Sequence, residues 1–310
     1  MKKNKFDELT DAIYRKSPLQ KKKLEKYLAK QDNQFFESAE VFATDYFSYL
    51  NSQKIPVEYA VNAYLKMCNN MLKCQVFFMK NGTYPLLGNA KEAFDNVYNN
   101  EVEMKSLVIA LAMSQFLWST HYKMYQFLIN NVKQRKENIS RYLEIGPGHG
   151  LFLKDAYKIL VNENPDIKMT ALDISQTSMD ITKSIINHSI GKTKIEYIVM
   201  DMLDYEKDAK YDFISLGEVI EHVNFPDKLL LKFSKLLSDK GHGFISTCVD
   251  CPTIDHVYHF KSVGEIQQMI QNNGLIIVDE LILPVEDLPM EEIVAKKITI
   301  NYCAIVRRKL

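Results

Sequence analysis

Cysteines are few in this sequence, and long apolar runs are missing. Five cysteines occur among 310 residues, an odd number without regular spacing. This usage indicates a reducing compartment and argues against a secreted fold held by disulfides. The longest apolar stretch, LVIALAM at 107–113, is far shorter than a bilayer span. The start, MKKNKFDELTDAIYRKSP, lacks the apolar segment of a signal peptide. We therefore expect a cytoplasmic protein without membrane contact.

An excess of charge of one sign is missing as well. Lys and Arg together number 39, as do Asp and Glu, so the formal net charge is zero. A neutral chain offers nucleic acid no overall electrostatic attraction. Lysines are dense only in the first 30 residues, in KKNK and KKKLEK, and we interpret them as a solvated helix face. Nucleic acid is not expected as a partner.

The first part of the chain has a helical period. From residue 5 to about 133, apolar residues recur at three and four positions, as in SLVIALAMSQFLWSTHYKMYQFLINNV. This period predicts roughly five or six helices and no strand. Turns are predicted at 16–18, near 55 and at 80–89, and a polar linker at 133–138. We expect an all-helical N-terminal domain over 1–135.

Short apolar runs alternate with helix-length segments in the rest of the chain. The predicted strands are 141–146, 168–175, 194–201, 211–217, 241–249, 275–283 and 299–308. Such alternation is typical of βαβ units with a parallel sheet covered on both faces. We predict an α/β domain over 136–310, with a Rossmann-like, mostly parallel seven-stranded sheet and an antiparallel last strand.

A glycine turn follows the first predicted strand, in LEIGPGHG at 143–150. In a doubly wound sheet this turn carries the ligand, and Gly146 and Gly148 let the backbone approach it closely. A dinucleotide fingerprint would have a third glycine where this chain has Leu151. Glu144 at the strand end disfavours a pyrophosphate and favours a cationic ligand.

Two further acidic residues end the next predicted strands. Asp173 can accept hydrogen bonds from two ribose hydroxyls, and Asp201 from an exocyclic amine such as that of adenine. Together with Glu144, they describe a positively charged nucleoside without phosphate.

Over 139–310 the sequence resembles the class I S-adenosylmethionine-dependent methyltransferases. The motifs LEIGPGHG, ALDIS, VMDMLD and YDFISLGEVIEHV carry this resemblance in that order. It implies S-adenosylmethionine as cofactor, with the methionyl part at the glycine turn, the ribose after the second strand and the adenine after the third. The cofactor-binding residues implied are Glu144, Gly146, Pro147, Gly148, Asp173, Ile174, Asp201 and Met202.

Two glutamates and a histidine follow the fourth predicted strand in GEVIEHV. Glu218, Glu221 and His222 are spaced i, i+3 and i+4, so a helix would place them on one face. The segment after the fifth strand, STCVDCPTIDHVYHF, adds His256 and His259 at the same edge. Carboxylates and imidazoles that converge on a cleft can bind a divalent cation with open positions.

This pattern resembles the metal-dependent small-RNA 3'-terminal 2'-O-methyltransferases. The resemblance implies Glu218, Glu221, His222 and His256 as ligands, with His259 as a further candidate, for Mn²⁺, Fe²⁺, Co²⁺ or Mg²⁺. Quinone-precursor O-methyltransferases carry a similar motif without metal, so two alternatives remain open. In one, His222, His256 and Glu218 act as catalytic residues without metal; in the other, the groups are structural.

Two other features have open interpretations. Cys248 and Cys251 close a strand before a proline, which argues against a redox pair, and a zinc site with His256 and His259 remains an alternative. Aromatic residues in LWSTHYKMYQF can face a flat substrate or belong to the core. They are Trp118, His121, Tyr122 and Tyr125.

A helical domain before the first strand is similar in architecture to small-molecule methyltransferases, where it forms a lid over the acceptor and a homodimer contact. No basic stripe for RNA appears beyond residue 30. We expect methyl transfer to an oxygen, less readily a nitrogen, of a small-molecule acceptor. The alternatives are an RNA 2'-O-methyltransferase and a cofactor-binding module without activity.

Overall fold

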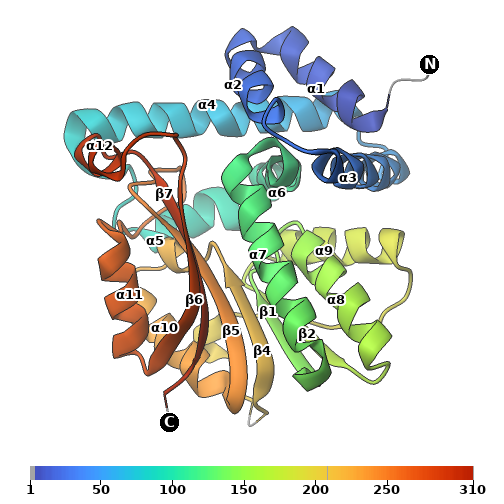
Figure 1. Ribbon diagram of the computed structural model, residues 1–310, viewed down its shortest axis with the longest axis vertical. Coiled ribbons are helices and arrows are strands. Elements are labelled where there is room, and N and C mark those ends of the chain that lie inside the picture. The colour runs from blue at the N-terminus through green and yellow to red at the C-terminus, as the bar shows by residue number, and fades with distance from the viewer. Residues whose placement is uncertain (1–3, 208, 310) are drawn as a thin grey trace.

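A layer of helices lies over one edge of a seven-stranded sheet, and further helices cover both faces of that sheet (Figure 1). The computed structural model describes residues 4–207 and 209–309. Within these ranges, no helix is both long enough and apolar enough to cross a bilayer.

Capping residues set the ends of the helices in the first part of the chain. The helices are α1 (Lys5–Lys16), α2 (Pro18–Leu28), α3 (Asn33–Ser52), α4 (Val57–Asn81), α5 (Ala90–Ala93), α6 (Glu101–Leu117) and α7 (Ser119–Arg135). The Ser17 hydroxyl caps α2 by accepting from the Gln20 N–H, and a proline takes the first helical position. Gly82 ends α4 with a φ of 72°. The predicted turns at 16–18, near 55 and at 80–89 are confirmed.

The predicted linker at 133–138 is wrong. Helix α7 runs directly into a 3-10 turn, η2 (Lys136–Asn138), which ends just before the first strand. Met124, Leu128 and Val132 recur four residues apart along α7 and are buried in the core beside the sheet. This apolar stripe holds the end of the helix on the core, and the polar residues of KQRKEN face solvent.

The sheet has the order β3-β2-β1-β4-β5-β7-β6. Its strands are β1 (Arg141–Ile145), β2 (Lys168–Asp173), β3 (Glu196–Val199), β4 (Tyr211–Gly217), β5 (Leu237–Val249), β6 (Leu275–Pro284) and β7 (Ile300–Arg308). Strand β7 is antiparallel to both neighbours, and the pairs from β3 to β5 are parallel. The predicted fold class is confirmed.

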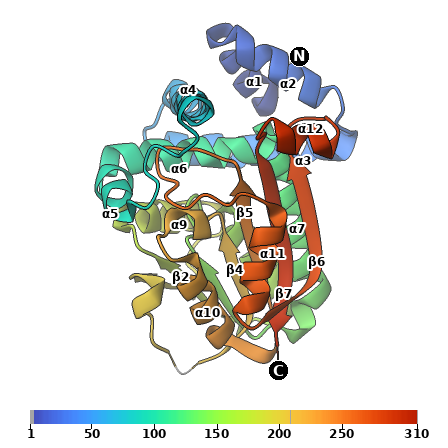
Figure 2. The same cartoon turned by 90° about the vertical axis from the view of Figure 1, so that its left-hand side faces the viewer.

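Helices pack on both faces of the sheet, as Figure 2 shows from the side. They include α8 (Leu151–Glu163), α9 (Gln176–Ser189), α10 (Pro226–Leu236) and α11 (Val263–Asn272). The short α12 (Met290–Ala295) lies instead at the ends of β6 and β7 nearest the helical layer (Figures 1 and 2). Apolar residues of α10 and α11, such as Phe233 and Ile270, share a core with one face of the sheet. Residues of α7, α8 and α9 form the core on the other face. Such a doubly wound sheet has its ligand crevice between the carboxyl ends of β1 and β4, where the strand order reverses.

The helical layer is joined to this second part of the chain through α8 and α9. Leu151 and Ile185 belong to the same buried cluster as Phe35 and Tyr64 of the layer. The Lys154 ammonium lies 2.9 Å from the Asp45 carboxylate, with only 7% of the lysine side chain exposed. The layer therefore lies fixed above the carboxyl edge of the sheet.

Candidate active site

The glycine turn after β1 lies against the turn after β4. Gly146 has a φ of 65° and Gly148 a φ of 53°, a region that side chains disfavour. A β-carbon on Gly146 would lie 2.7 Å from the Val219 Cγ2, so the contact itself requires glycine. The turn then leads through Gly150 into the start of α8.

Glu144 lies in the core beside the glycine turn. Its Oε2 accepts from the Tyr142 hydroxyl at 2.7 Å, and its side chain is almost fully buried. Burial raises the pKa of Glu144 to about 8, although hydrogen bonds from Tyr142 and the Leu153 N–H oppose the rise. The group is therefore mostly protonated near neutral pH. The contact of Glu144 with a cationic ligand stays a prediction.

Asp173 is held by the start of the next helix. Its Oδ1 accepts from the Ser175 N–H at 2.9 Å and its Oδ2 from the Ser178 hydroxyl at 2.7 Å. Burial raises the pKa of Asp173, and these hydrogen bonds act against the rise. A buried, oriented carboxyl group at this strand end suits recognition of a hydroxyl pair.

An apolar and an acidic group are exposed together at the ends of β2 and β3. Ile174 is 44% exposed, and Asp201 is exposed as well. The Asp201 Oδ1 accepts from the Leu203 N–H at 2.8 Å, which fixes the carboxylate, and Met202 beside it is buried. An apolar face and a carboxylate fit a flat base that carries an amine.

The predicted helix over the glutamates after β4 is wrong. Glu218 is left-handed, with a φ of 53°, and only a single 3-10 turn, η4 (Ile220–His222), follows. The Glu218 N–H donates to the Ser246 carbonyl at 3.0 Å, which ties this turn to β5. A left-handed non-glycine residue costs backbone strain of order 1 kcal/mol, and such strain is common at functional sites.

The charged groups nevertheless come together. Ligand atoms of Glu221, His222 and His256 lie within 4.8 Å of one another, and those of Glu218, Glu221 and Cys248 do so as well. The Glu221 Oε2 accepts from the Thr247 hydroxyl at 2.8 Å. The Oε1 atoms of Glu218 and Glu221 are buried without a hydrogen-bond partner among the described residues. Burial, reinforced for Glu221 by the neighbouring Glu218, raises the pKa of both.

Each of the two histidines has one ring nitrogen held by the backbone. The His222 Nδ1 lies 3.1 Å from the Asp255 carbonyl, and the His256 Nδ1 lies 2.6 Å from the Cys251 carbonyl. A carbonyl can only accept, so Nδ1 carries the proton in both rings and each Nε2 keeps its lone pair. The rings meet edge to face, with centroids 4.7 Å apart. Burial, with His222 adding to it, lowers the pKa of His256 to about 3, so this ring is neutral.

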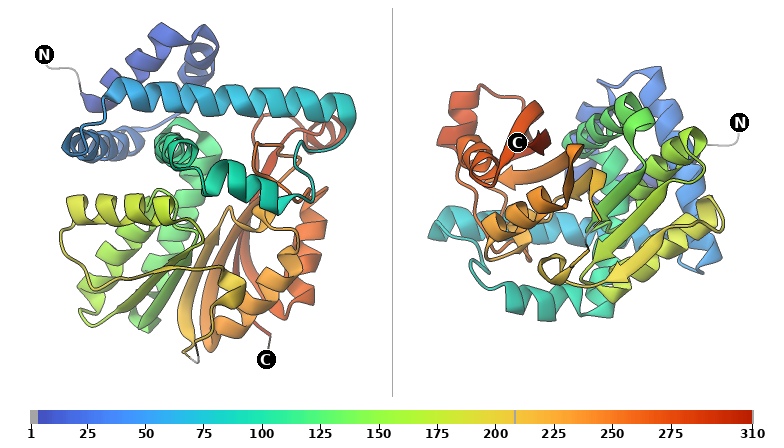
Figure 3. Two further views of the ribbon diagram at one scale, coloured as in Figure 1. Left: turned by 180° about the vertical axis from the view of Figure 1, so that it is seen from behind. Right: turned by 90° about the horizontal axis from the view of Figure 1, so that it is seen from below.

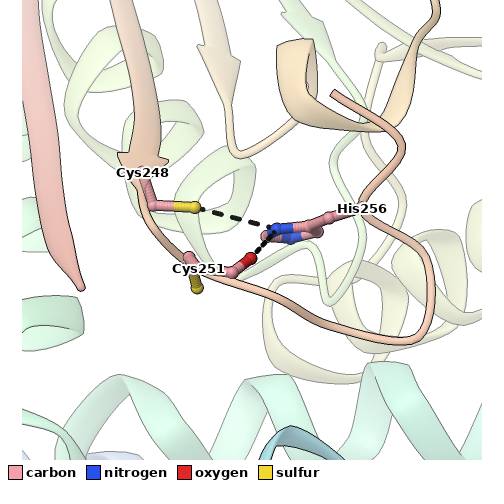
Figure 4. A group of neighbouring side chains, drawn as sticks. All are labelled: Cys248, Cys251 and His256. Atoms are coloured by element: carbon pink, nitrogen blue, oxygen red, sulfur yellow. Dashed lines mark hydrogen bonds between the residues drawn. The ribbon is translucent and has the colours of Figure 1, made fainter. Parts of the chain in front are cut away.

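The two cysteines lie on the Nδ1 side of His256. Figure 4 shows that this nitrogen faces the Cys248 sulfur and the Cys251 carbonyl, which accepts its proton. A zinc ion bound by Nδ1 and both thiolates would require that hydrogen bond to break. His259, a candidate from the sequence, lies elsewhere: its Nε2 is 2.7 Å from Asp250, and its ring stacks on Tyr84.

A cavity of about 1130 Å³ opens between this group and the helical layer. Glu218, His222 and His256 line it on the sheet side. Its other walls come from α2, α3, α4, α6 and α7, and include Trp118, His121 and Tyr122. Tyr125, the fourth aromatic candidate, instead donates its hydroxyl proton to Asp155 at 2.8 Å.

One residue of this site, Tyr98, was not predicted. Its hydroxyl lies 2.7 Å from the His222 Nδ1 and 2.9 Å from the Asp255 Oδ2. It comes from the helical part of the chain, 124 positions before its histidine partner. The sequence around it, FDNVYNN, has no motif that would connect it with the strand ends.

The strand order and the glycine turn after β1 are those of the class I methyltransferase fold. The model of the methyltransferase domain family matches residues 119–280, slightly more than half of the chain. The chain belongs to this family, and the prediction from the four ordered motifs is confirmed.

Curated relatives have a narrower description. The chain is 28% identical over 123 residues to a ubiquinone biosynthesis O-methyltransferase of Rickettsia bellii, covering 39% of this chain and 48% of that protein. A protein of the same description from Pelagibacter ubique is 29% identical over 121 residues, covering 39% and 47%. The chain thus spans about half the length of the curated relatives it matches.

Solved structures share the fold. The structure described as PigF with SAH has a TM-score of 0.55 at 13% identity and covers 82% of this chain and 74% of its own. An O-methyltransferase family protein from Burkholderia thailandensis has a TM-score of 0.52 at 12% identity, covering 81% and 72%. At these identities the likeness shows the fold alone.

Proposed function

We propose that this protein transfers the methyl group of S-adenosylmethionine to a hydroxyl oxygen of a small molecule, assisted by a divalent metal. The observation that supports this best is the group of Glu218, His222 and His256 at the cavity wall, with Glu221 buried beside them. Its two histidines carry their proton on Nδ1, which leaves each Nε2 with a lone pair. Two of its carboxyl oxygens are buried without a hydrogen-bond partner among the described residues. The name of the curated relatives supports oxygen as the acceptor atom.

The donor set fits a metal ion. Unpartnered buried carboxyl oxygens cost free energy unless a cation or donor satisfies them. Metal-binding histidines characteristically donate their other ring N–H to a carbonyl, as both histidines do here. Mixed nitrogen and oxygen ligands suit Mn²⁺, Fe²⁺ or Co²⁺ at least as well as Mg²⁺. When bound, such an ion would lower the pKa of an acceptor hydroxyl.

The residues of the chain divide the remaining work. Gly146, Pro147 and Gly148 leave room for the methionyl part, Asp173 with Ile174 holds the ribose, and Asp201 with Met202 holds the adenine. In-line displacement then breaks the bond between methyl carbon and sulfur and forms a carbon–oxygen bond, with the electron pair left on sulfur. Only without a metal would the acceptor proton move to the Nε2 of His222 or His256, because a bound metal would occupy these lone pairs and the acidified hydroxyl would lose its proton to water.

The helical part, residues 1–135, covers the acceptor in this proposal. It is supported by the cavity, which residues of α2, α3, α4 and α7 line together with the histidines. The mixed wall, with leucines, methionines and aromatic rings, suits a partly apolar small molecule rather than a polyanion. A homodimer contact through this part stays a prediction.

Calorimetry with S-adenosylhomocysteine tests the cofactor site, and Mn²⁺ titration followed by electron paramagnetic resonance tests the metal. A catechol such as 3,4-dihydroxybenzoate serves as the probe acceptor, because vicinal hydroxyls chelate. We expect His256→Ala to abolish methylation while S-adenosylhomocysteine affinity stays within about twofold. Tight binding of a dinucleotide without binding of S-adenosylhomocysteine would overturn the proposal. Cofactor binding without turnover on any hydroxylated probe would favour a module without activity.

A further inference from the structure

The segment between α4 and α6, residues 82–100, crosses the carboxyl ends of the strands, as the left view of Figure 3 shows. We call it the strap. The Gly88 N–H donates to the Val257 carbonyl at 2.7 Å, and the Tyr84 hydroxyl accepts from the Cys251 N–H at 2.7 Å. The strap is thus fastened to the loop after β5, which carries His256.

Tyr98 is the point where the strap reaches the centre of the site. It is the last residue of a π-helix, η1 (Phe94–Tyr98), a form that occurs often at functional sites. Its carbonyl accepts from the Ser175 hydroxyl at 2.8 Å, and the Ser175 N–H in turn holds Asp173. Its hydroxyl meets His222 and Asp255. One residue therefore contacts the loops after β2, β4 and β5.

The direction of the hydrogen bonds at the Tyr98 hydroxyl follows from its partners. The Asp255 Oδ2 lies 2.9 Å from the phenol oxygen, and a carboxylate oxygen can only accept. Asp255 therefore accepts the phenol proton. The phenol oxygen is left to accept from the His222 Nδ1–H, which also lies near the Asp255 carbonyl. The shorter of these two contacts is the one to Tyr98.

We propose that Tyr98 is a positioning residue for methyl transfer: it holds the His222 ring with Nε2 unprotonated and fixes this ring relative to the Asp173 loop. This inference rests on the proposed function for what the two loops bind. The positions of the acceptor and the cofactor relative to each other decide the rate of an in-line displacement. A residue that contacts both loops couples these positions.

Tyr98→Phe tests this role because it removes only the hydroxyl. The chain has seven histidines, so ¹⁵N-labelled imidazole resonances can be resolved, and His222→Asn assigns the His222 signal. We expect the His222 Nδ1–H to exchange with solvent at least about tenfold faster in Tyr98→Phe. Mn²⁺ affinity should fall about tenfold, as for other residues that support a metal ligand. S-adenosylhomocysteine affinity should stay within about twofold, because the backbone contact to Ser175 is kept.

Tyr302→Phe is the matched control. Its buried hydroxyl donates to the Glu280 carboxylate at 2.8 Å on the far strands β6 and β7. It should leave the histidine spectrum, the Mn²⁺ affinity and the S-adenosylhomocysteine affinity unchanged. Asp255→Ala, which removes the acceptor of the Tyr98 proton, should also speed up Nδ1–H exchange and serves if Tyr98→Phe does not fold.

The outcomes separate the two proposals. Unchanged exchange of the His222 Nδ1–H in both Tyr98→Phe and Asp255→Ala would overturn the positioning role, whatever the protein binds. Failure of the unsubstituted protein to bind S-adenosylhomocysteine would overturn the proposed function instead. The histidine spectrum needs neither cofactor nor metal, so it still decides the role of Tyr98.

Discussion

Buried carboxyl groups lie on both sides of the crevice between β1 and β4. Glu144 has a hydrogen-bond donor in Tyr142, whereas Glu221 has a donor for only one of its oxygens. Burial makes the ionised form costly in both places, but only the second group lies close to other side chains of a type that can bind a metal. Glu144 thus has a hydrogen-bond donor from its own strand, whereas Glu221 keeps one oxygen that a cation would satisfy.

Glu144→Gln should change the pH dependence of stability. The raised pKa of about 8, against 4.5 in a free side chain, means that native Glu144 keeps its proton over a range where the unfolded chain has lost it. Stability of the unsubstituted protein is full below about pH 4.5 and falls as pH rises to about 8. Gln keeps an acceptor for Tyr142 without this cost. In urea unfolding, the free energy of unfolding of the variant relative to the unsubstituted protein should increase by up to about 4 kcal/mol from pH 5 to pH 8. An equal difference at both pH values would contradict the assignment.

The sequence predicted which residues gather here better than it predicted their backbone. Glu218, Glu221 and His222 follow one strand and His256 the next parallel one, so they had to meet at one edge of the sheet. The helix expected over them did not form, because a left-handed Glu218 bonded to β5 is a tertiary feature that no local pattern reveals. Tyr98 left no signal for the same reason.

At the level of elements, the glycine turn between β1 and α8 is the most constrained connection near the site. Gly146 combines a positive φ with a contact that leaves no room for a β-carbon. Gly191 also has a positive φ, of 91°, but no atom lies within 4 Å of the place where its β-carbon would be. Substituting both glycines therefore distinguishes the effect of backbone strain, which both share, from the effect of the contact with Val219, which only Gly146 has.

Gly146→Ala should weaken S-adenosylhomocysteine binding by at least about tenfold, because the new methyl group would push the glycine turn and Val219 apart. It should also lower the free energy of unfolding by about 1 to 3 kcal/mol. Gly191→Ala should show only a small loss of stability and unchanged affinity. Calorimetry and urea unfolding measure both effects. Equal affinity in the two variants would mean that the turn does not approach the cofactor.

Strands were easier to predict than the connections around them. Buried parallel strands such as β1 and β4 read as short apolar runs, and their positions agree closely with 141–146 and 211–217. The prediction of a linker at 133–138 was wrong because the polar residues there lie on the exposed side of α7. The buried side, with Leu128 and Val132, packs on the sheet. A helix that ends against a sheet looks, in sequence, like a helix that ends in solvent.

At the scale of the whole molecule, the contacts that hold the helical layer over the sheet could not be predicted from the sequence. Its position depends on contacts across long separations, such as Lys154 with Asp45, 109 positions apart. Asp45 also accepts from the Ser189 hydroxyl at 2.8 Å, so α3 is tied to α8 and to the end of α9. Burial alone would raise the pKa of Asp45, but Lys154 and Ser189 lower it. The carboxylate is therefore charged and balances a lysine that is almost fully buried.

Asp45→Ala should destabilise the protein by up to about 3 kcal/mol, since it removes the nearer partner of the buried Lys154 ammonium and leaves only Asp155, 3.9 Å away. The helical layer and the sheet share a core through α8 and α9, so unfolding should remain one cooperative transition that shifts by a few degrees. Asp287→Ala is the control, because its ion pair with Lys30 is exposed and should leave the melting temperature unchanged. Differential scanning calorimetry measures both. Two separate transitions in Asp45→Ala would show that the shared core does not couple the parts, and no shift would show that Lys154 finds water instead.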